Sequence, residues 1–348
     1  EDIWVKGTFR SKSIAGIRSM NNGENYCILT SEGIEKYSYK DGKKVETIVS
    51  FTGLNFKNAE EQVFEYEFNS DETKVLLATS PQFIYRRSYL ANYYVYDMNT
   101  KQITSVCDEK VRLADFSPNG SMVAYVKDNN IYVLSLADMS VRQLTTDGAF
   151  NKIIYGTTDW VYEEEFAITK GFFWSPDSKK IAFYSFDESK VKEFTIPYYG
   201  ELYPMQYTYK YPKAGEDNSV IGVHVYDIET SKTHNIDLGP EKDIYVPRLQ
   251  WTLNNEVFLH KLNRHQNHYE LFLINCNDYK MQKVYDERNE CYIEQAENVT
   301  FLADKQHFIL KSEKNGFMNL YKVGLYTREI EPITSGKYDV DQICYIDP

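Results

Sequence analysis

The feature that most constrains the fold of this chain is a strand unit that recurs along its whole length. Each copy starts with a polar turn that leads into a short strand of alternating apolar residues, and a strand, a turn and another strand follow. Most copies lie about 50 residues apart, which is close to the length of a four-stranded β-propeller blade. The clearest copies start with the turns at residues 70–73, 117–120 and 175–178, and others start near residues 22, 253 and 303.

The alternative architecture with a similar density of strands is a β-sandwich. A sandwich does not predict a Ser-Pro-Asn or Ser-Pro-Asp turn ahead of every second strand, as at Ser117 and Ser175. The 30 Tyr and 19 Phe also suit sheet surfaces, where aromatic rings pack against cross-strand neighbours. We therefore predict an all-β fold with one β-propeller domain over residues 1–348, built from about six blades of four antiparallel strands.

Two intervals break the repeat. Residues 159–166 lie between the last predicted strand of one blade and the first strand of the next, and they are too long for a hairpin turn. We expect them to project from the propeller face, where functional loops gather. Residues 191–215 are rich in Tyr and Pro, and Pro limits further strand pairing. They form either a hairpin folded on its own blade or an arm that extends away from it.

The first of these intervals carries three adjacent carboxylates behind a run of bulky residues. Like charges this close repel one another, and most such runs are solvated turns. Here Trp160, Tyr162 and Phe166 indicate a backbone anchored in a packed body, so the carboxylates need a cation. On a strand, Glu164 and Glu165 would point to opposite faces, so joint action requires a helical turn or a bulge. Two converging carboxylates could then hold one ammonium group, which has three donors.

The string Asp159-Trp160-Val161-Tyr162-Glu163-Glu164-Glu165 resembles the double-glutamate motif of the dipeptidyl peptidase IV family of serine exopeptidases. The resemblance covers essentially the whole chain. It extends to three further segments, which are Arg86-Arg87-Ser88-Tyr89, Phe173-Trp174-Ser175-Pro176-Asp177 and Tyr211-Pro212-Lys213-Ala214-Gly215.

The resemblance implies a role for each matching residue. Glu164 and Glu165 would bind the free N-terminal amine of a peptide substrate, and Arg86 would help to hold the carbonyl of the substrate. Glu163 lies outside the pair, so its truncation should matter much less. The parent enzyme would release dipeptides from peptides with Pro or Ala in the second position. Residues 191–215 would be the extended arm of the family, which helps to build a homodimer, and Tyr enrichment fits such an interface.

The chain contains no Gly-x-Ser-x-Gly nucleophile motif. In the family, the propeller of about eight blades precedes a C-terminal α/β-hydrolase domain that carries the catalytic Ser, Asp and His. We therefore expect this chain to be the propeller part of a longer protease, a mature fragment without its signal peptide, and to be inactive alone. Two alternatives stay open. One is a non-catalytic propeller that binds or scaffolds other proteins, and the other is the propeller of a related prolyl tripeptidyl peptidase.

Composition limits the expected binding partners and the expected cellular location of the protein. The formal net charge of −12 argues against nucleic acid, and no apolar run is long enough to span a membrane. We expect no metal or cofactor, because the grouped histidines His260, His265 and His268 lack the spacing of a known metal site. The five scattered cysteines contain no Cys-x-x-Cys, and a sequon starts at Asn298. These features favour a periplasmic or secreted protein of a Gram-negative bacterium over an animal ectodomain.

Overall fold

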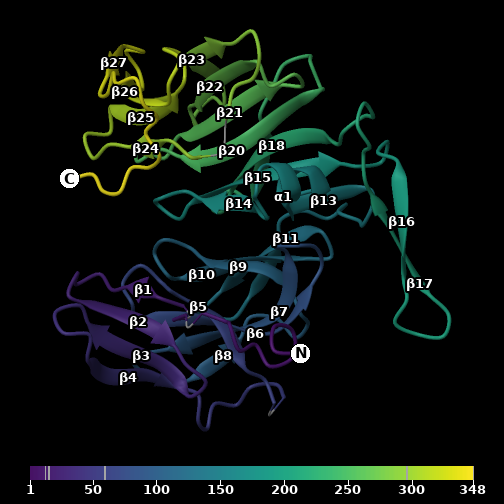
Figure 1. Ribbon diagram of the computed structural model, residues 1–348, viewed down its shortest axis with the longest axis vertical. Helices are drawn as coiled ribbons and strands as arrows, with labels where there is room; N and C mark the ends of the chain where they lie inside the picture. The colour runs from purple at the N-terminus through teal and green to yellow at the C-terminus, as the bar shows by residue number, and fades with distance from the viewer. Residues whose placement is uncertain (12, 15, 59, 295–296, 348) are drawn as a thin grey trace. The chain divides into compact units, whose positions relative to one another are not determined.

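The computed structural model describes residues 1–348 except 12, 15, 59, 295, 296 and 348. Its regular structure is almost entirely β (Figure 1). The described strands form six antiparallel sheets of four or five strands and one separate two-stranded hairpin. The prediction of an all-β chain with about six four-stranded repeats is confirmed.

In the first three sheets, strands that are neighbours in sequence are also neighbours in the sheet. The first sheet contains β1 (Arg18–Ser19), β2 (Asn25–Leu29), β3 (Gly33–Ser38) and β4 (Lys44–Ser50). The second contains β5 (Val63–Phe68), β6 (Lys74–Phe83), β7 (Tyr89–Asp97) and β8 (Ile103–Ser105). The third contains β9 (Arg112–Phe116), β10 (Met122–Lys127), β11 (Asn130–Ser135) and β12 (Val141–Gln143).

The fifth and sixth sheets repeat this order, and the fourth has one extra strand. The fourth sheet contains β13 (Ile153–Thr157), β14 (Lys170–Trp174), β15 (Lys180–Asp187), β18 (Val220–Asp227) and β19 (Lys232–Asn235). The fifth contains β20 (Ile244–Trp251), β21 (Val257–Asn263), β22 (His268–Ile274) and β23 (Met281–Arg288). The sixth contains β24 (Thr300–Phe301), β25 (His307–Ser312), β26 (Asn319–Gly324) and β27 (Ile330–Pro332).

The recurring polar turns precede the second strand of a sheet, and their own side chains close them. Ser175 donates to the Asp177 carboxylate at 2.6 Å and accepts the N–H of Lys180 at 2.8 Å. Ser117 likewise donates to the Asn119 side chain at 2.8 Å and accepts the N–H of Met122 at 3.0 Å. These side-chain bonds satisfy backbone groups that a tight reversal leaves unpaired. The repeated Ser-Pro-Asn/Asp therefore sets where each of these strands begins.

The helix α1 (Trp160–Glu165) interrupts the first strand of the fourth sheet. The strand β13 pairs with one end of β15 and β14 pairs with the other end, so the two behave as one strand with an excursion between them. They also pair directly, with Gly156 opposite Gly171. A Cβ on Gly171 would lie 2.6 Å from the backbone oxygen of Thr157, so this close approach needs glycine. The prediction that residues 159–166 separate two blades was therefore wrong.

The chain forms two compact units, each with its own apolar core. The first unit comprises Glu1–Tyr85, Tyr89–Val123 and Leu134–Asp138, and the second comprises Arg86–Ser88, Ala124–Val133 and Met139–Pro348. The core of the first unit includes the buried residues Cys27, Ile34, Val49, Tyr66, Val75, Leu77, Tyr94 and Tyr96. The main core of the second unit joins the fourth, fifth and sixth sheets and includes Val161, Tyr162 and Phe166, so α1 rests on that core.

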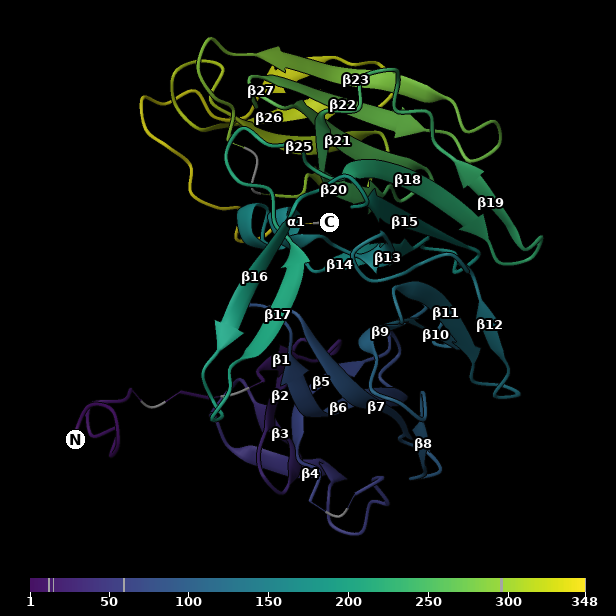
Figure 2. The same ribbon diagram turned by 90° about the vertical axis from the view of Figure 1, so that its right-hand side faces the viewer.

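The strands β16 (Glu193–Tyr198) and β17 (Met205–Lys210) pair only with each other in the part of the chain that the structure describes. Figure 2 shows this hairpin extending away from β15 and β18. Its base is held by hydrogen bonds from the Tyr211 N–H to the Lys192 carbonyl at 3.0 Å and from the Lys210 ammonium to the Val191 carbonyl at 2.8 Å. Of the two alternatives for residues 191–215, the extended arm is therefore correct.

No helix among the described residues combines the length and the apolar character needed to cross a membrane.

Candidate functional site

The helix α1 begins where a buried carboxylate caps it. One oxygen of Asp159 accepts the N–H of Tyr162 at 2.9 Å, and the other accepts the hydroxyl of Ser219 at 2.6 Å. Asp is a favoured N-cap residue because its side chain satisfies an otherwise unpaired helical N–H. Burial raises the pKa of the Asp159 carboxyl, and the hydrogen bonds from Ser219 and the helix backbone oppose that rise. The cap fixes the start of α1 and thereby places the acidic residues at its end.

Aromatic side chains anchor α1 to the second unit, as the sequence predicts. The hydroxyl of Tyr162 accepts the N–H of Val246 at 2.8 Å, and its ring lies 4.8 Å from that of Phe186 in an edge-on contact. At the other end, the Phe166 carbonyl accepts a hydrogen bond from the guanidinium of Arg248 at 3.1 Å. These bonds tie both ends of a six-residue helix that would be unstable alone.

The three adjacent glutamates at the end of α1 occupy different environments. Glu163 is fully buried, and one of its oxygens accepts the N–H groups of Arg87 and Ser88, each at 2.8 Å. Glu164 has a side chain that is 16% exposed, and its carboxylate lies 3.6 Å from the Arg86 Nε and 4.0 Å from an Arg87 Nη. Glu165 is exposed and has no hydrogen bond or ion pair with any described residue.

The structure thus brings two predicted site residues, Arg86 and Glu164, into contact from distant parts of the sequence. The helical turn required for Glu164 and Glu165 to act together is present as α1. Sequence reasoning missed the anchoring of Glu163, because its partners are backbone N–H groups 75 and 76 residues away, which leave no side-chain pattern.

The charges around α1 leave room for a cation. One oxygen of Glu163 accepts two backbone N–H groups, while its other oxygen is buried without a hydrogen-bond partner among the described residues. Glu164 is shared between two arginines at long ion-pair distances. The exposed Glu165 adds a negative charge that no described residue neutralises. A group with several N–H donors and a positive charge, such as an ammonium, would complement this arrangement.

A hydrogen-bonded Ser-His-Asn chain lies elsewhere in the fourth sheet. The Ser185 hydroxyl lies 2.8 Å from one ring nitrogen of His224, and the other ring nitrogen lies 2.7 Å from the side-chain oxygen of Asn235. Ser185 sits in a strand paired on both sides, opposite Tyr155 and Gly222, so the nearby backbone N–H groups serve the sheet. An oxyanion needs free, convergent donors, and this position offers none from the strand. We therefore do not assign it as a nucleophile.

The grouped histidines do not form a shared metal site. His260 is buried and its Nδ1 lies 2.8 Å from the hydroxyl of Tyr269. His268 faces Glu270 and Asp286, and these three side chains are close enough to hold an ion. However, the Lys283 ammonium already lies 3.3 Å from Glu270 and 2.6 Å from Asp286, and its positive charge opposes a metal there.

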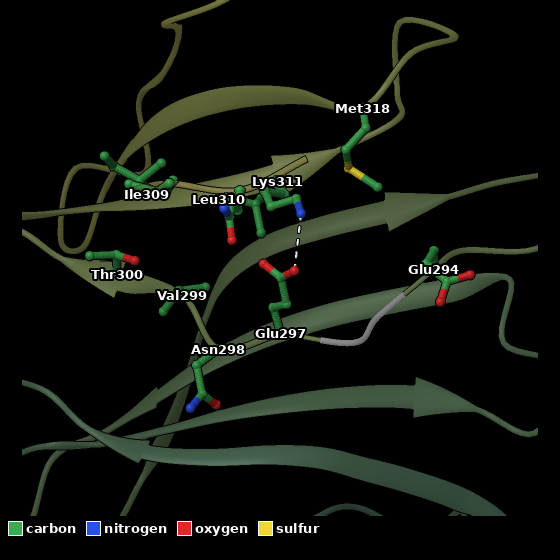
Figure 3. Close-up of a pocket in the computed structure, with 11 residues that line it drawn as sticks. Glu294, Glu297, Asn298, Val299, Thr300, Ile309, Leu310, Lys311 and Met318 are labelled. Carbon is green, nitrogen blue, oxygen red and sulfur yellow. Dashed lines mark hydrogen bonds and ion pairs between the residues drawn. The ribbon is translucent and has the colours of Figure 1, made fainter. Parts of the chain in front are cut away.

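A cavity of about 350 Å³ lies against the sixth sheet and is lined in part by Val299, Leu310 and Lys311 (Figure 3). Figure 3 shows Lys311 directed toward Glu297, and the two charged groups are 3.1 Å apart. These opposite charges engage each other, whereas Glu294, which also lines the cavity, is exposed and pairs with no described residue.

The antiparallel sheets and the acidic helix inserted in one of them define a β-propeller domain with an exposed carboxylate site. The chain belongs to the family described as the dipeptidyl peptidase IV (DPP IV) N-terminal region, whose model matches residues 69–348.

Individual relatives agree with this assignment. The crystal structure of dipeptidyl peptidase 4 from Porphyromonas gingivalis superimposes with a TM-score of 0.90 and 37% identity, over 97% of this chain and 49% of that one. Dipeptidyl aminopeptidase B of Saccharomyces cerevisiae is 31% identical over 78% of this chain and 35% of its own length. Dipeptidyl peptidase 4 of Trichophyton equinum is 27% identical over 97% of this chain and 45% of its own length. The chain therefore spans half or less of the length of these relatives.

Proposed function

We propose that residues 1–348 form the substrate-selecting propeller domain of a longer serine exopeptidase that releases N-terminal dipeptides. The preferred peptides carry Pro or Ala in the second position. In this proposal Glu164 and Glu165 bind the protonated α-amine of the peptide, and Arg86 holds its backbone carbonyl. The C-terminal α/β-hydrolase domain of the same polypeptide supplies the nucleophile. Because α1 binds the terminal amine, it also limits the length of the released fragment.

The observation that carries the proposal is that the glutamates on α1 differ in how far hydrogen bonds and ion pairs compensate their charges. The mostly buried Glu164 is held near Arg86, while the exposed Glu165 has no partner among the described residues. A substrate ammonium would add the missing positive charge and up to three N–H donors. The Arg86 side chain is 72% exposed, so most of its guanidinium donors stay available for a substrate oxygen.

The proposal includes a homodimer that forms through the arm at residues 191–215. The tip of the arm exposes Tyr199, Leu202 and Tyr203 by 81%, 91% and 83%. Adjacent exposed aromatic and aliphatic side chains are typical of interfaces. The strands of the arm pair with no other described strand, so their outer edges are open to a second copy.

We extend the proposal to a periplasmic or secreted location. The cysteines are all free in the structure, a pattern that favours a bacterial protein over a disulfide-rich ectodomain.

The proposed function is tested by truncating the acidic pair in the full-length protein. Removing one member of a desolvated charge pair costs about 2–5 kcal/mol. The variants Glu164→Ala and Glu165→Ala should therefore lower kcat/KM for a chromogenic Gly-Pro amide by roughly 30-fold to several thousand-fold, at about 1.36 kcal/mol per factor of ten. The loss should be confined to substrates with a free amine, so an N-acetylated analogue should show no further decrease.

The matched control is Glu229→Ala, which removes an exposed carboxylate in the turn between β18 and β19. It should keep the wild-type kcat/KM. If both α1 variants also keep it, Glu164 and Glu165 form a solvated turn and the assignment fails. A folded full-length protein without any turnover would instead favour the non-catalytic scaffold, and release of tripeptides would favour the tripeptidyl alternative.

A further inference from the structure

Glu163 is the most buried of the three glutamates, yet no cation is paired with its carboxylate among the described residues. Its side chain is fully inaccessible, and the two N–H groups that it accepts come from consecutive residues, Arg87 and Ser88. Burying a charge is unfavourable unless hydrogen bonds replace the lost water, and bonds to an ionised acceptor are the stronger kind. One oxygen of the carboxylate is therefore bonded by the backbone of a different segment of the chain, and the other oxygen has no hydrogen-bond partner among the described residues.

Both the side chain and the backbone of Glu163 accept hydrogen bonds from this segment. The guanidinium of Arg87 donates to the backbone carbonyl of Glu163 at 2.9 Å, beside the two bonds that the Glu163 side chain accepts. Arg86–Ser88 pack with the unit that contains α1, whereas Tyr85 and Tyr89 on either side of them pack with the other unit. Phe83 of β6 pairs with Tyr89 of β7 at the base of this loop, and the bonds to α1 hold the three residues within it.

The position of the Arg86 side chain is the one most sensitive to a change in this segment. Its side chain is 72% exposed, and its contact with Glu164 is a long ion pair of 3.6 Å. Exposed ion pairs hold an arginine weakly, because the side chain keeps many competing rotamers. The place of the guanidinium therefore depends on where the backbone of Arg86 is held.

We infer that Glu163 is a positioning residue, which fastens the Arg86–Ser88 segment to α1 and so sets Arg86 at a working distance from Glu164. This inference rests on the proposed function, in which Arg86 and Glu164 contact the substrate. It reverses the expectation that truncating Glu163 has little effect.

A double-mutant cycle in the full-length protein tests the inference. A shift of about 1 Å in a positioning group can lower activity about 100-fold. Glu163→Ala and Arg86→Ala should each reduce kcat/KM for the Gly-Pro amide by roughly 10- to 100-fold. The double variant should be no more than about threefold worse than Arg86→Ala alone, because residues that act through each other are non-additive. Glu163→Gln keeps an oxygen that can accept both N–H groups, so it should stay within about tenfold of wild type.

A second readout does not depend on activity. Hydrogen exchange should be slow for the Arg87 and Ser88 amides in the wild-type protein and faster in Glu163→Ala, with Glu163→Gln in between. Thermal denaturation shows whether each variant is folded. Should Glu163→Ala fail to fold, Arg87→Ala replaces it in the cycle. It removes one of the three bonds together with the 4.0 Å contact between Arg87 and Glu164, and it leaves the Glu163 carboxylate in place.

Losses that multiply in the double variant, or a Glu163→Ala enzyme with wild-type kcat/KM and unchanged exchange, would overturn the inference. So would a folded Glu163→Gln as impaired as Glu163→Ala, since that would assign the effect to charge. The proposed function fails separately, when Glu164→Ala leaves activity unchanged. In that case faster exchange in Glu163→Ala still supports the fastening of the segment.

Discussion

At the residue scale, neighbouring identical side chains have different environments because the fold gives them different partners. Glu163 faces inward toward backbone donors, Glu164 faces two arginines, and Glu165 faces solvent. A helix rotates successive side chains by about 100°, which is why three consecutive residues meet three environments.

Lys180 and Asp227 form a directly paired cross-strand ion pair of 3.1 Å on β15 and β18. Burial alone would raise the pKa of Asp227, but hydrogen bonds from Thr230 and the Lys180 ammonium outweigh it and lower the pKa from 3.8 to about 2. Because the folded pKa lies below the unfolded one, this stabilisation is present above pH 3.8 and is lost as the pH falls toward 2.

We expect Asp227→Asn to lower the free energy of unfolding at neutral pH by about 1–2 kcal/mol, since one unit of pKa shift corresponds to about 1.4 kcal/mol. The variant should also lose less stability than the wild type between about pH 4 and pH 2. Thermal denaturation across that range measures both effects. Asp217→Asn, at an exposed position, is the control. Parallel pH profiles for Asp227→Asn and the wild type would contradict the prediction.

The sequence predicted Arg86 as a site residue only through a family resemblance, because nothing local links it to α1. Glu164 and Glu165 were also indicated by the residues themselves, as two carboxylates that could converge on an ammonium group. The aromatic anchors were predicted from the residues themselves, since bulky side chains next to charges indicate a packed backbone. The role of Glu163 had no such signal. Its partners are backbone N–H groups, which every residue except proline carries.

At the scale of elements, turn chemistry made the strand order predictable. Ser117 and Ser175 close their turns with bonds to residues within the same short stretch, so the signal is local. The place of α1 was not predictable in this way. The strands β13 and β14 form one interrupted strand only because both pair with β15, and strand pairing is not local information.

The arm should determine the oligomeric state. Replacing residues 196–207 with Asn-Gly would leave the Thr195–Thr208 pair as the last of the hairpin, and Asn-Gly favours a two-residue turn between paired strands. The base contact of Tyr211 with Trp160, at a ring distance of 4.4 Å, would be kept. In the full-length protein we expect a folded monomer by light scattering.

A milder variant tests the contribution of the exposed side chains of the arm while its backbone is kept. Tyr199→Ser combined with Leu202→Ser keeps the hairpin and removes two of its most exposed apolar side chains. It should weaken the dimer without abolishing the fold. A dimer that both variants leave unchanged would assign the interface to another part of the protein.

At the scale of the whole molecule, the chain carries the proposed recognition site but no recognised nucleophile motif. Its sequence has no Gly-x-Ser-x-Gly, and the site on α1 is built to hold charge rather than to attack a carbonyl. The matched relatives extend well beyond the aligned part, which covers 35–49% of those cited. Binding and chemistry are therefore expected to reside in different parts of the parent polypeptide.

The 348-residue chain alone should thus show no peptidase activity. Incubated with a chromogenic Gly-Pro amide, it should give no turnover above a buffer blank, because an activated nucleophile requires a base and convergent oxyanion donors. The described side chains that most resemble a nucleophile and its base are Ser185 and His224, with Asn235 behind the histidine. His224 lies within hydrogen-bond distance of Ser185, but Ser185 sits in a fully paired strand. Ser185→Ala is accordingly the matched control. Turnover that is abolished both by a serine-directed inhibitor and by Ser185→Ala would show that the propeller holds a nucleophile of its own, and that recognition and hydrolysis are not divided between domains.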